Sequence, residues 1–179
     1  DLSIEAESLV APLRRTGVAA LSYLVTEDTL VVWLVTQEGE VRVAARVAVS
    51  ADTLRALVAA LRADLGADSA RGGMARSGGQ AVEQEATRGL GTRAVRGGVT
   101  GQAAARRLAQ WLVPAEVVSA VPAGTELVIV PHGVLGLVPF ALLPVGDSAQ
   151  PLGLRNALRY VPSLAALRAV DAGSGAAPT

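Results

Sequence analysis

The 179-residue chain contains no cysteine and no lysine. Without cysteine it can form neither a disulfide nor a zinc–thiolate site, and it has no thiolate nucleophile. Without lysine it has neither Schiff-base chemistry nor the lysine of a phosphate-binding P-loop. All sixteen basic residues are arginines, which we attribute to the coding bias of a GC-rich genome. The lack of cysteine fits a cytoplasmic location, which we take as an expectation.

Net charge, aromatic residues and long apolar runs are also scarce. Sixteen basic residues balance sixteen acidic ones, so no overall field attracts nucleic acid or an anionic membrane. Apolar residues make up 51% of the chain but aromatic residues only 3%, so the core must consist mainly of Val, Leu and Ala. The longest mostly apolar stretch, Val134 to Val145, is too short to span a bilayer. No signal peptide is visible, and the missing initial Met suggests a piece of a longer protein.

Strand-forming runs dominate the first fifty residues. A short helix is predicted to begin at Ser3 and to end at Gly17. Three β-rich runs then follow, separated by short polar turns, which is the pattern of an antiparallel meander. The runs are Ala19–Val25, Leu30–Val35 and Val41–Ser50.

The third run alternates in a way that predicts one buried and one solvated face. Val41, Val43 and Ala45 alternate with residues 42, 44 and 46, two of which are arginines. Because successive side chains of a strand point to opposite faces, we expect the face that carries the two valines to be buried.

The clearest helix pattern follows this meander. Ser50 or Asp52 is predicted to cap the helix, and Gly66 is predicted to end it. Its apolar stripe has helical spacing and consists of Leu54, Leu57, Val58, Leu61 and Leu65.

Residues 67–100 differ in composition from both flanks. With its flanking glycines, the segment holds ten of the nineteen glycines and few large apolar residues. It therefore offers little burial to offset the cost of ordering the chain, and we predict a long flexible insertion.

The pattern of ordered structure returns after the insertion. A helix is predicted from Gln102 to the residue before Pro114, and the tail at 171–179 is predicted to be disordered. Between them we expect the strand Leu127–Val130, a turn at His132–Gly133, a strand over Val134–Leu143, a short strand at Arg159–Val161, and a helix at Leu164–Val170 capped by Ser163.

Two short motifs and the single histidine suggest function but carry little weight. Gly78-Gly79-Gln80 spells the tripeptide of peptide release factors, and RGG occurs at residues 71–73 and 96–98. Both are most simply chance matches in a glycine-rich loop, because the chain is neutral and the loop has no aromatic residue for base stacking. His132 has no cysteine partner and no G-x-S-x-G elbow, and too few ligands surround it in the sequence for a metal site. We assign it a turn or packing role.

The stretch around His132 resembles the CHAT domain, the caspase-like domain often attached to tetratricopeptide repeats. Three segments carry the resemblance: LVIVPHG at Leu127–Gly133, LVPFALLP at Leu137–Pro144, and LRYVPSLAAL at Leu158–Leu167. The run Leu21–Val35 and the RRLAQWLV segment at 106–113 also look like this domain. In most relatives the position of His132 is Asp or Asn, so the resemblance implies that His132 is not the family's catalytic histidine.

The resemblance implies an α/β fold in which residues 1–179 form the N-terminal half of a CHAT-like domain. This half would be an antiparallel meander with covering helices, like the pseudoprotease half of a caspase-like (clan CD type) domain. The family's catalytic His and Cys lie beyond the Pro-Ser helix, so we expect no catalytic, cofactor-binding or metal-binding residue in this chain. The implied function is the scaffold half of a cysteine endopeptidase.

A non-catalytic interaction or regulatory module derived from the CHAT domain is the alternative. A His-Gly and a later Cys in the downstream sequence would favour the enzyme, and their absence would favour the module. The expected partners are the C-terminal protease half and, less directly, tetratricopeptide repeats or another regulatory protein. Neither nucleic acid nor a membrane is expected, and an unrelated α/β binding domain is a third, weaker interpretation.

Overall fold

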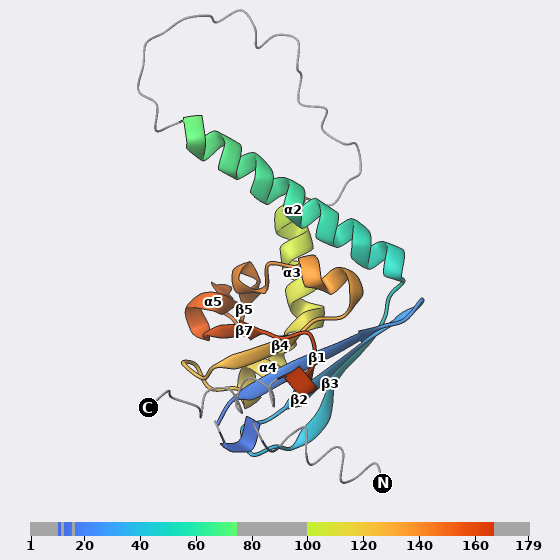
Figure 1. Ribbon diagram of the computed structural model, residues 1–179. Helices are drawn as coiled ribbons and strands as arrows, with labels where there is room; N and C mark the ends of the chain where they lie inside the picture. The colour runs from blue at the N-terminus through green and yellow to red at the C-terminus, as the bar shows by residue number, and fades with distance from the viewer. Residues whose placement is uncertain (1–10, 12, 16, 75–99, 167–179) are drawn as a thin grey trace, which may run out of the picture.

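A computed structural model describes residues 11, 13–15, 17–74 and 100–166 and confirms an α/β fold (Figure 1). Its centre is a five-stranded sheet in the order β3-β2-β1-β4-β7. The predicted antiparallel meander forms β1, β2 and β3, whereas β4 pairs parallel to β1 and β7 pairs parallel to β4. The strands are β1 (Ala19–Val25), β2 (Thr29–Val35), β3 (Val41–Ala48), β4 (Leu127–Val130) and β7 (Leu158–Tyr160).

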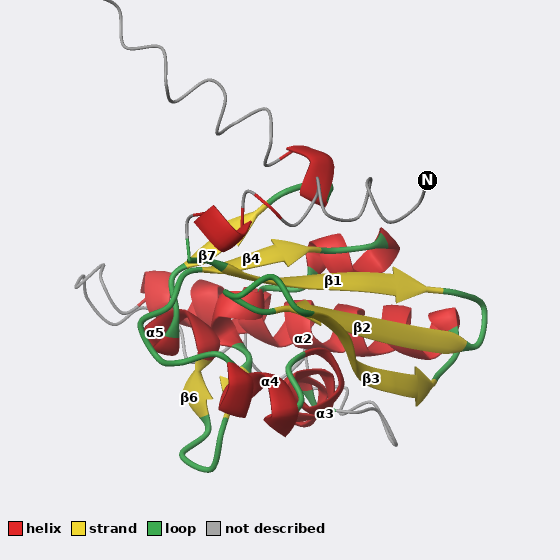
Figure 2. Ribbon diagram, turned by 90° about the horizontal axis from the view of Figure 1, so that it is seen from below, coloured by secondary structure: helices red, strands yellow, loops and turns green. Residues whose placement is uncertain are grey.

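Helices and short turns cover one face of this sheet (Figure 2). The helices are α2 (Ala51–Met74), α3 (Gly101–Leu112), α4 (Ala115–Ala120) and α5 (Leu152–Arg155). Two 3-10 turns, η2 (Gly133–Leu137) and η3 (Phe140–Leu142), precede a small hairpin of β5 (Pro144–Val145) and β6 (Gln150–Pro151). None of the described helices is long and apolar enough to serve as a membrane span.

The alternation of side chains along the strands divides the core in two. On β1, Leu21 and Tyr23 point towards the helices and join the larger cluster, which also holds Leu54 of α2 and Leu108 of α3. Ala20 points to the other face and joins a smaller cluster. That cluster contains Leu13, Val18, Ala20, Val35, Val128, Val130 and Val161, with Leu164 packed against it. β1 is buried between the two clusters and is therefore the central strand in packing as well as in order.

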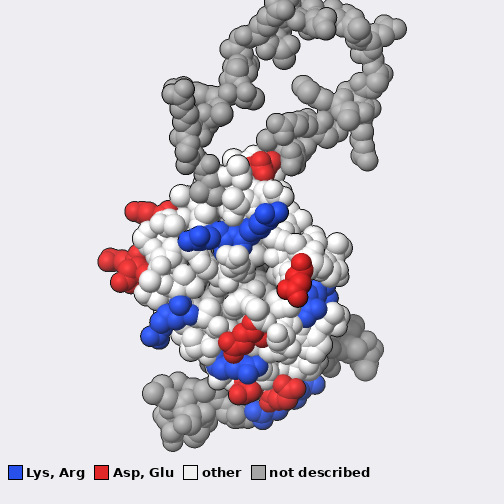
Figure 3. Space-filling model, turned by 180° about the vertical axis from the view of Figure 1, so that it is seen from behind, with Lys and Arg blue, Asp and Glu red and all other residues white. Residues whose placement is uncertain are grey.

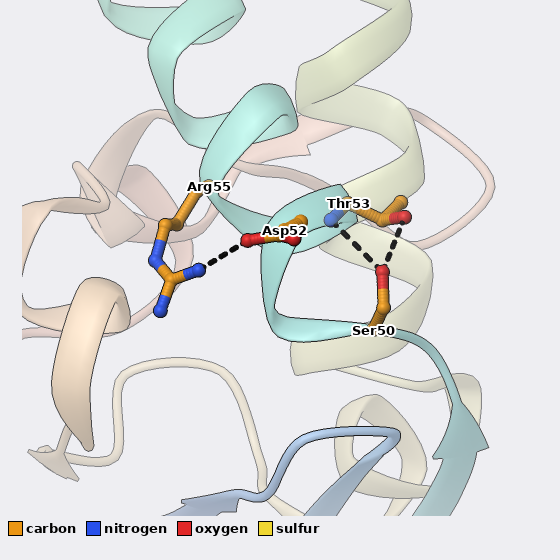
Figure 4. Close-up of polar contacts among 4 residues, drawn as sticks. All are labelled: Ser50, Asp52, Thr53 and Arg55. Atoms are coloured by element: carbon orange, nitrogen blue, oxygen red, sulfur yellow. Dashed lines mark hydrogen bonds and ion pairs between the residues drawn. The ribbon is translucent and has the colours of Figure 1, made fainter.

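Side-chain caps fix where α2 and α3 begin. The Ser50 hydroxyl accepts a hydrogen bond from the Thr53 N–H at 3.1 Å, while Arg55 pairs with Asp52 on the exposed surface (Figure 4). The Ser50 cap satisfies an otherwise unpaired amide and contributes about 1 kcal/mol, whereas such an exposed ion pair contributes about 0–1 kcal/mol. Thr100 caps α3 in the same way, by accepting from the Ala103 N–H at 3.2 Å.

The predicted end of α2 at Gly66 was wrong. The helix continues to Met74, well beyond that glycine. A glycine inside a helix costs only about 1 kcal/mol relative to alanine, and the following residues include good helix formers such as Ala67, Ala70 and Arg71. The RGG tripeptide at residues 71–73 therefore belongs to a helix backbone rather than to a loop.

The predicted buried face of β3 was also wrong. Val41 and Val43 are 54% and 48% exposed, whereas Ala45 and Val47 pack against the larger core cluster. The cause is a shift in register between Val32 and Trp33 of the neighbouring strand, which breaks the simple alternation of β3. Since β3 is an edge strand, its two valines face solvent next to Trp33 and Val35 of β2.

The strand predicted over Val134–Leu143 does not form. The two 3-10 turns η2 and η3 replace it, and this segment buries Leu135, Phe140 and Leu143. A short apolar run is ambiguous between strand and turn, and Pro139 removes an amide that a strand ladder would need. Phe140 is fully buried in the core cluster that includes Leu127 and Ile129, as the sequence predicted.

Other elements lie where the sequence placed them, to within a residue or so at their ends. These are β1, β2, α3, β4 and β7. The last described helical turn begins after Ser163, as predicted, and the Ser163 hydroxyl accepts from the Ala166 N–H at 3.3 Å. Of the helix predicted between Ser3 and Gly17, the described residues 11 and 13–15 are helical.

Several predicted segments lie wholly or partly outside the described residues. The start of the helix predicted from Ser3 falls on residues 1–10, most of the 67–100 insertion falls on 75–99, and the 171–179 tail falls on 167–179. The flexibility of the insertion and the disorder of the tail therefore stay predictions.

Candidate interaction surface

His132 follows β4 and holds the end of β1. Its Nδ1 accepts a hydrogen bond from the Val25 N–H at 3.0 Å, and the residue is exposed. The imidazole therefore satisfies a backbone amide where β1 ends, next to the parallel strand β4. This contact agrees with the turn or packing role that the sequence predicted.

No catalytic or metal-binding set surrounds His132 in the described part of the chain. The nearby Thr26 hydroxyl is engaged with Asp28 and with the Thr29 carbonyl, so it is not paired with the imidazole. Among the described residues no group of three or more His, Asp or Glu side chains could hold a metal ion.

A groove of about 510 Å³ lies between α3, α4 and the β5–β6 hairpin. Its lining includes the apolar side chains of Ala109, Val113 and Val145, with Arg106 and Asp147 as its charged members. The Ser119 hydroxyl in this groove donates to the Ala115 carbonyl at 2.9 Å, and no histidine lines the groove to activate it. The groove therefore offers shape but no reactive pair.

Three aromatic rings pack against one another near the β7 edge of the sheet. Phe140 lies between two tyrosines, with its ring 5.4 Å from the Tyr23 ring and 6.2 Å from the Tyr160 ring. Burial raises the pKa of Tyr23 well above its usual value, and burial also raises the pKa of Tyr160. Tyr160 nevertheless remains 50% exposed, so it links the core to the surface of β7.

Two exposed leucines belong to the elements next to Tyr160. Leu142 is part of η3 and is 51% exposed, and Leu154 is part of α5, which packs on η3, and is 74% exposed. The packing is close, because an added Cβ on Gly153 would lie 2.9 Å from the Ala141 Cβ. We call Leu142, Leu154 and Tyr160 the β7-edge patch.

Buried hydrogen bonds anchor the start of β7. Asn156 is buried, and its side-chain amide donates to the Pro122 and Thr125 carbonyls at 2.9 and 2.8 Å. Arg155 donates to the Val118 and Val121 carbonyls at 2.6 and 2.8 Å. These bonds tie the segment before β7 to α4 and to the loop before β4, and they add to the anchoring that the short β4–β7 ladder provides.

Charged residues do not gather into a patch of one sign on the surface in Figure 3, where arginine and acidic side chains are interspersed among uncharged ones. Near β7, Arg159 pairs with Glu126 at 2.7 Å, and Arg155 is engaged with backbone carbonyls. The arginines of β7 and α5 are therefore already engaged and do not make the β7-edge patch a site for an anion.

The chain is thus an α/β protein with exposed apolar residues near one edge of its sheet. Its sequence was also compared with models of known protein families. Residues 102–178 match the family model of the CHAT domain, which supports the resemblance to that domain for this part of the chain. The match does not extend to the Leu21–Val35 run, for which the resemblance stays a prediction. No curated protein and no solved structure matches the chain.

Proposed function

We propose that this chain is the non-catalytic scaffold half of a CHAT-type cysteine endopeptidase. The observation that carries the proposal is the CHAT match over residues 102–178 in a chain that contains no cysteine. A caspase-like peptidase needs a thiolate nucleophile and an imidazole base. Since this chain has no thiol, and since its one histidine binds the Val25 amide, both groups must come from a partner half.

The direct test is reconstitution. Residues 1–179 and the downstream half of the parent protein are expressed separately and then mixed, and turnover of a peptide substrate is followed. We expect turnover by the mixture and none by either half. A downstream half whose candidate catalytic Cys is replaced by Ala is the control, and this replacement should abolish turnover without preventing association. Full activity of the unmixed downstream half would refute the scaffold role.

A regulatory or protein-interaction module derived from the CHAT domain is the second candidate. The exposed β7-edge patch supports it as well as it supports the scaffold, because either role requires a docking surface. The two candidates differ in the downstream sequence. A His-Gly and a later Cys, each at the end of a strand, are required for the scaffold role and not for the module.

A further inference from the structure

We propose that the outer edge of β7, with which no strand of the described residues pairs, is the docking site for an extended strand of the protease half. The identity of the partner rests on the proposed function, whereas the position of the site rests on the geometry of β7 and of the β7-edge patch. The occupant is thus an extended, apolar segment rather than a helix or a charged ligand.

The hydrogen-bond pattern of β7 identifies an extended segment as the occupant. The Ala157 carbonyl accepts from the Leu127 N–H, and the Val161 N–H donates to the Ile129 carbonyl, so alternate residues of this segment point towards β4. Leu158 and Tyr160 therefore direct their backbone N–H and C=O groups away from the sheet. Neither makes a backbone hydrogen bond to another of the described residues. A further strand is the structure that would pair with both.

The β7-edge patch identifies the side chains that the occupant carries. Leu142, Leu154 and Tyr160 are exposed, and they belong to η3 or to elements that contact it. A three-residue edge provides few hydrogen bonds, so most of the affinity must come from apolar burial on this patch. The partner strand should therefore present apolar side chains to Leu142 and Leu154.

The family match favours this edge over the opposite one. Every residue of the β7-edge patch lies within the matched segment 102–178, whereas β3 lies outside it. The order of the parallel strands β1, β4 and β7 also follows the chain towards this edge, so a strand of the partner half would extend the same series.

Hydrogen exchange of the full chain, alone and with the separately expressed downstream half, tests the site. In the free chain, the amide hydrogens of Leu158 and Tyr160 should exchange rapidly. Addition of the downstream half should slow them by about tenfold or more, because a new strand would bond to them. The amides of β3 should not change.

Exposed substitutions provide the matched test. Leu154→Glu should weaken binding of the downstream half by about tenfold or more, since it places a charge in an apolar contact. Val41→Glu makes the same kind of change at a 54% exposed position on β3 and should leave binding within about twofold. Circular dichroism of both variants would establish that they remain folded.

Three outcomes distinguish the β7 site from the function on which it rests. If the mixed halves turn over peptide but protection appears on β3, or Val41→Glu is the variant that weakens binding, the scaffold role stands and the β7 site is refuted. If the halves do not bind, both fail. If the free chain shows concentration-dependent protection of Leu158 and Tyr160, a second copy occupies the edge and the assignment to the protease half is wrong.

Discussion

β3 and β7 both end the sheet, but they expose different features to solvent. β3 has eight residues and an irregular register against β2, and its partly exposed Arg42 and exposed Arg46 lie on the same strand as the exposed Val41 and Val43. β7 has three residues, and the chain beside it exposes Leu142 and Leu154. Bulges and charges protect an edge against unwanted pairing, whereas a short edge limits such pairing only by its length. β7 is therefore the edge that is better suited to a specific partner.

The largest expected effect concerns the ring that supports the β7 side. Phe140→Ala should lower the free energy of unfolding by about 3–5 kcal/mol, because Phe140 is fully buried between Tyr23 and Tyr160. Urea denaturation measures the loss. The matched change on the other edge, Val41→Ala, should cost less than about 0.5 kcal/mol. Equal losses from the two variants would contradict the contrast between the edges.

The next effect concerns the anchor of β7. Asn156→Ala should cost about 1–3 kcal/mol, because the Thr125 carbonyl loses its buried donor and the Pro122 carbonyl keeps only the 3.3 Å bond from the Thr125 N–H. Gln110→Ala removes an exposed amide and serves as the control in the same denaturation experiment. A loss for Asn156→Ala as small as that of the control would show that the loop holds β7 without this side chain.

A pH-dependent effect concerns Tyr23 on the central strand. Burial raises the pKa of the Tyr23 hydroxyl. As pH rises above the usual value of 10.0, the unfolded chain therefore loses the hydroxyl proton before the folded chain does. The contribution of Tyr23 to stability should therefore be complete below about pH 10 and should fall above it. Tyr23→Phe should reduce this fall, and at neutral pH it should cost about 1 kcal/mol through loss of the 2.9 Å bond to the Leu112 carbonyl. Urea denaturation of the parent chain and of Tyr23→Phe, at neutral pH and at a series of alkaline pH values, measures both effects. If stability falls equally with pH in the two chains, Tyr23 is not the cause of the fall.

The smallest effect concerns His132. His132→Ala should cost about 0.5–1.5 kcal/mol, because the Val25 amide loses its acceptor. His132→Asn should cost less than about 1 kcal/mol, since an amide oxygen can accept the same hydrogen bond. Thermal unfolding of the two variants provides the comparison. A large loss from His132→Asn together with a small loss from Phe140→Ala would reverse the roles assigned to these positions.

The sequence predicted elements whose pattern is local. β1 and β2 are apolar runs bounded by polar turns, α3 has its apolar residues at helical spacing, and Phe140 is the only phenylalanine within an apolar stretch. In these cases burial follows directly from periodicity, and the structure agrees. The assignment of His132 to a turn also depended only on its immediate neighbours.

The failures have causes that lie outside the local pattern. The register shift that turns Val41 and Val43 outwards is a property of the pair β2–β3, so β3 alone does not encode it. The turns over residues 133–142 bury Leu135 and Phe140 without strand pairing, which periodicity cannot distinguish from a short strand. The β7-edge patch was not predicted, because Leu142, Leu154 and Tyr160 belong to elements that meet only in the fold.

Gly153 shows how much of that patch depends on a missing side chain. An added Cβ at this position would meet the Ala141 Cβ at 2.9 Å and the Ala141 backbone at 3.2 Å. Any other residue would push α5 away from η3 and change the spacing of Leu142 and Leu154. A residue that takes no direct part in the patch therefore limits how the surface can vary, and a substitution at position 153 should disturb docking without changing any contact residue.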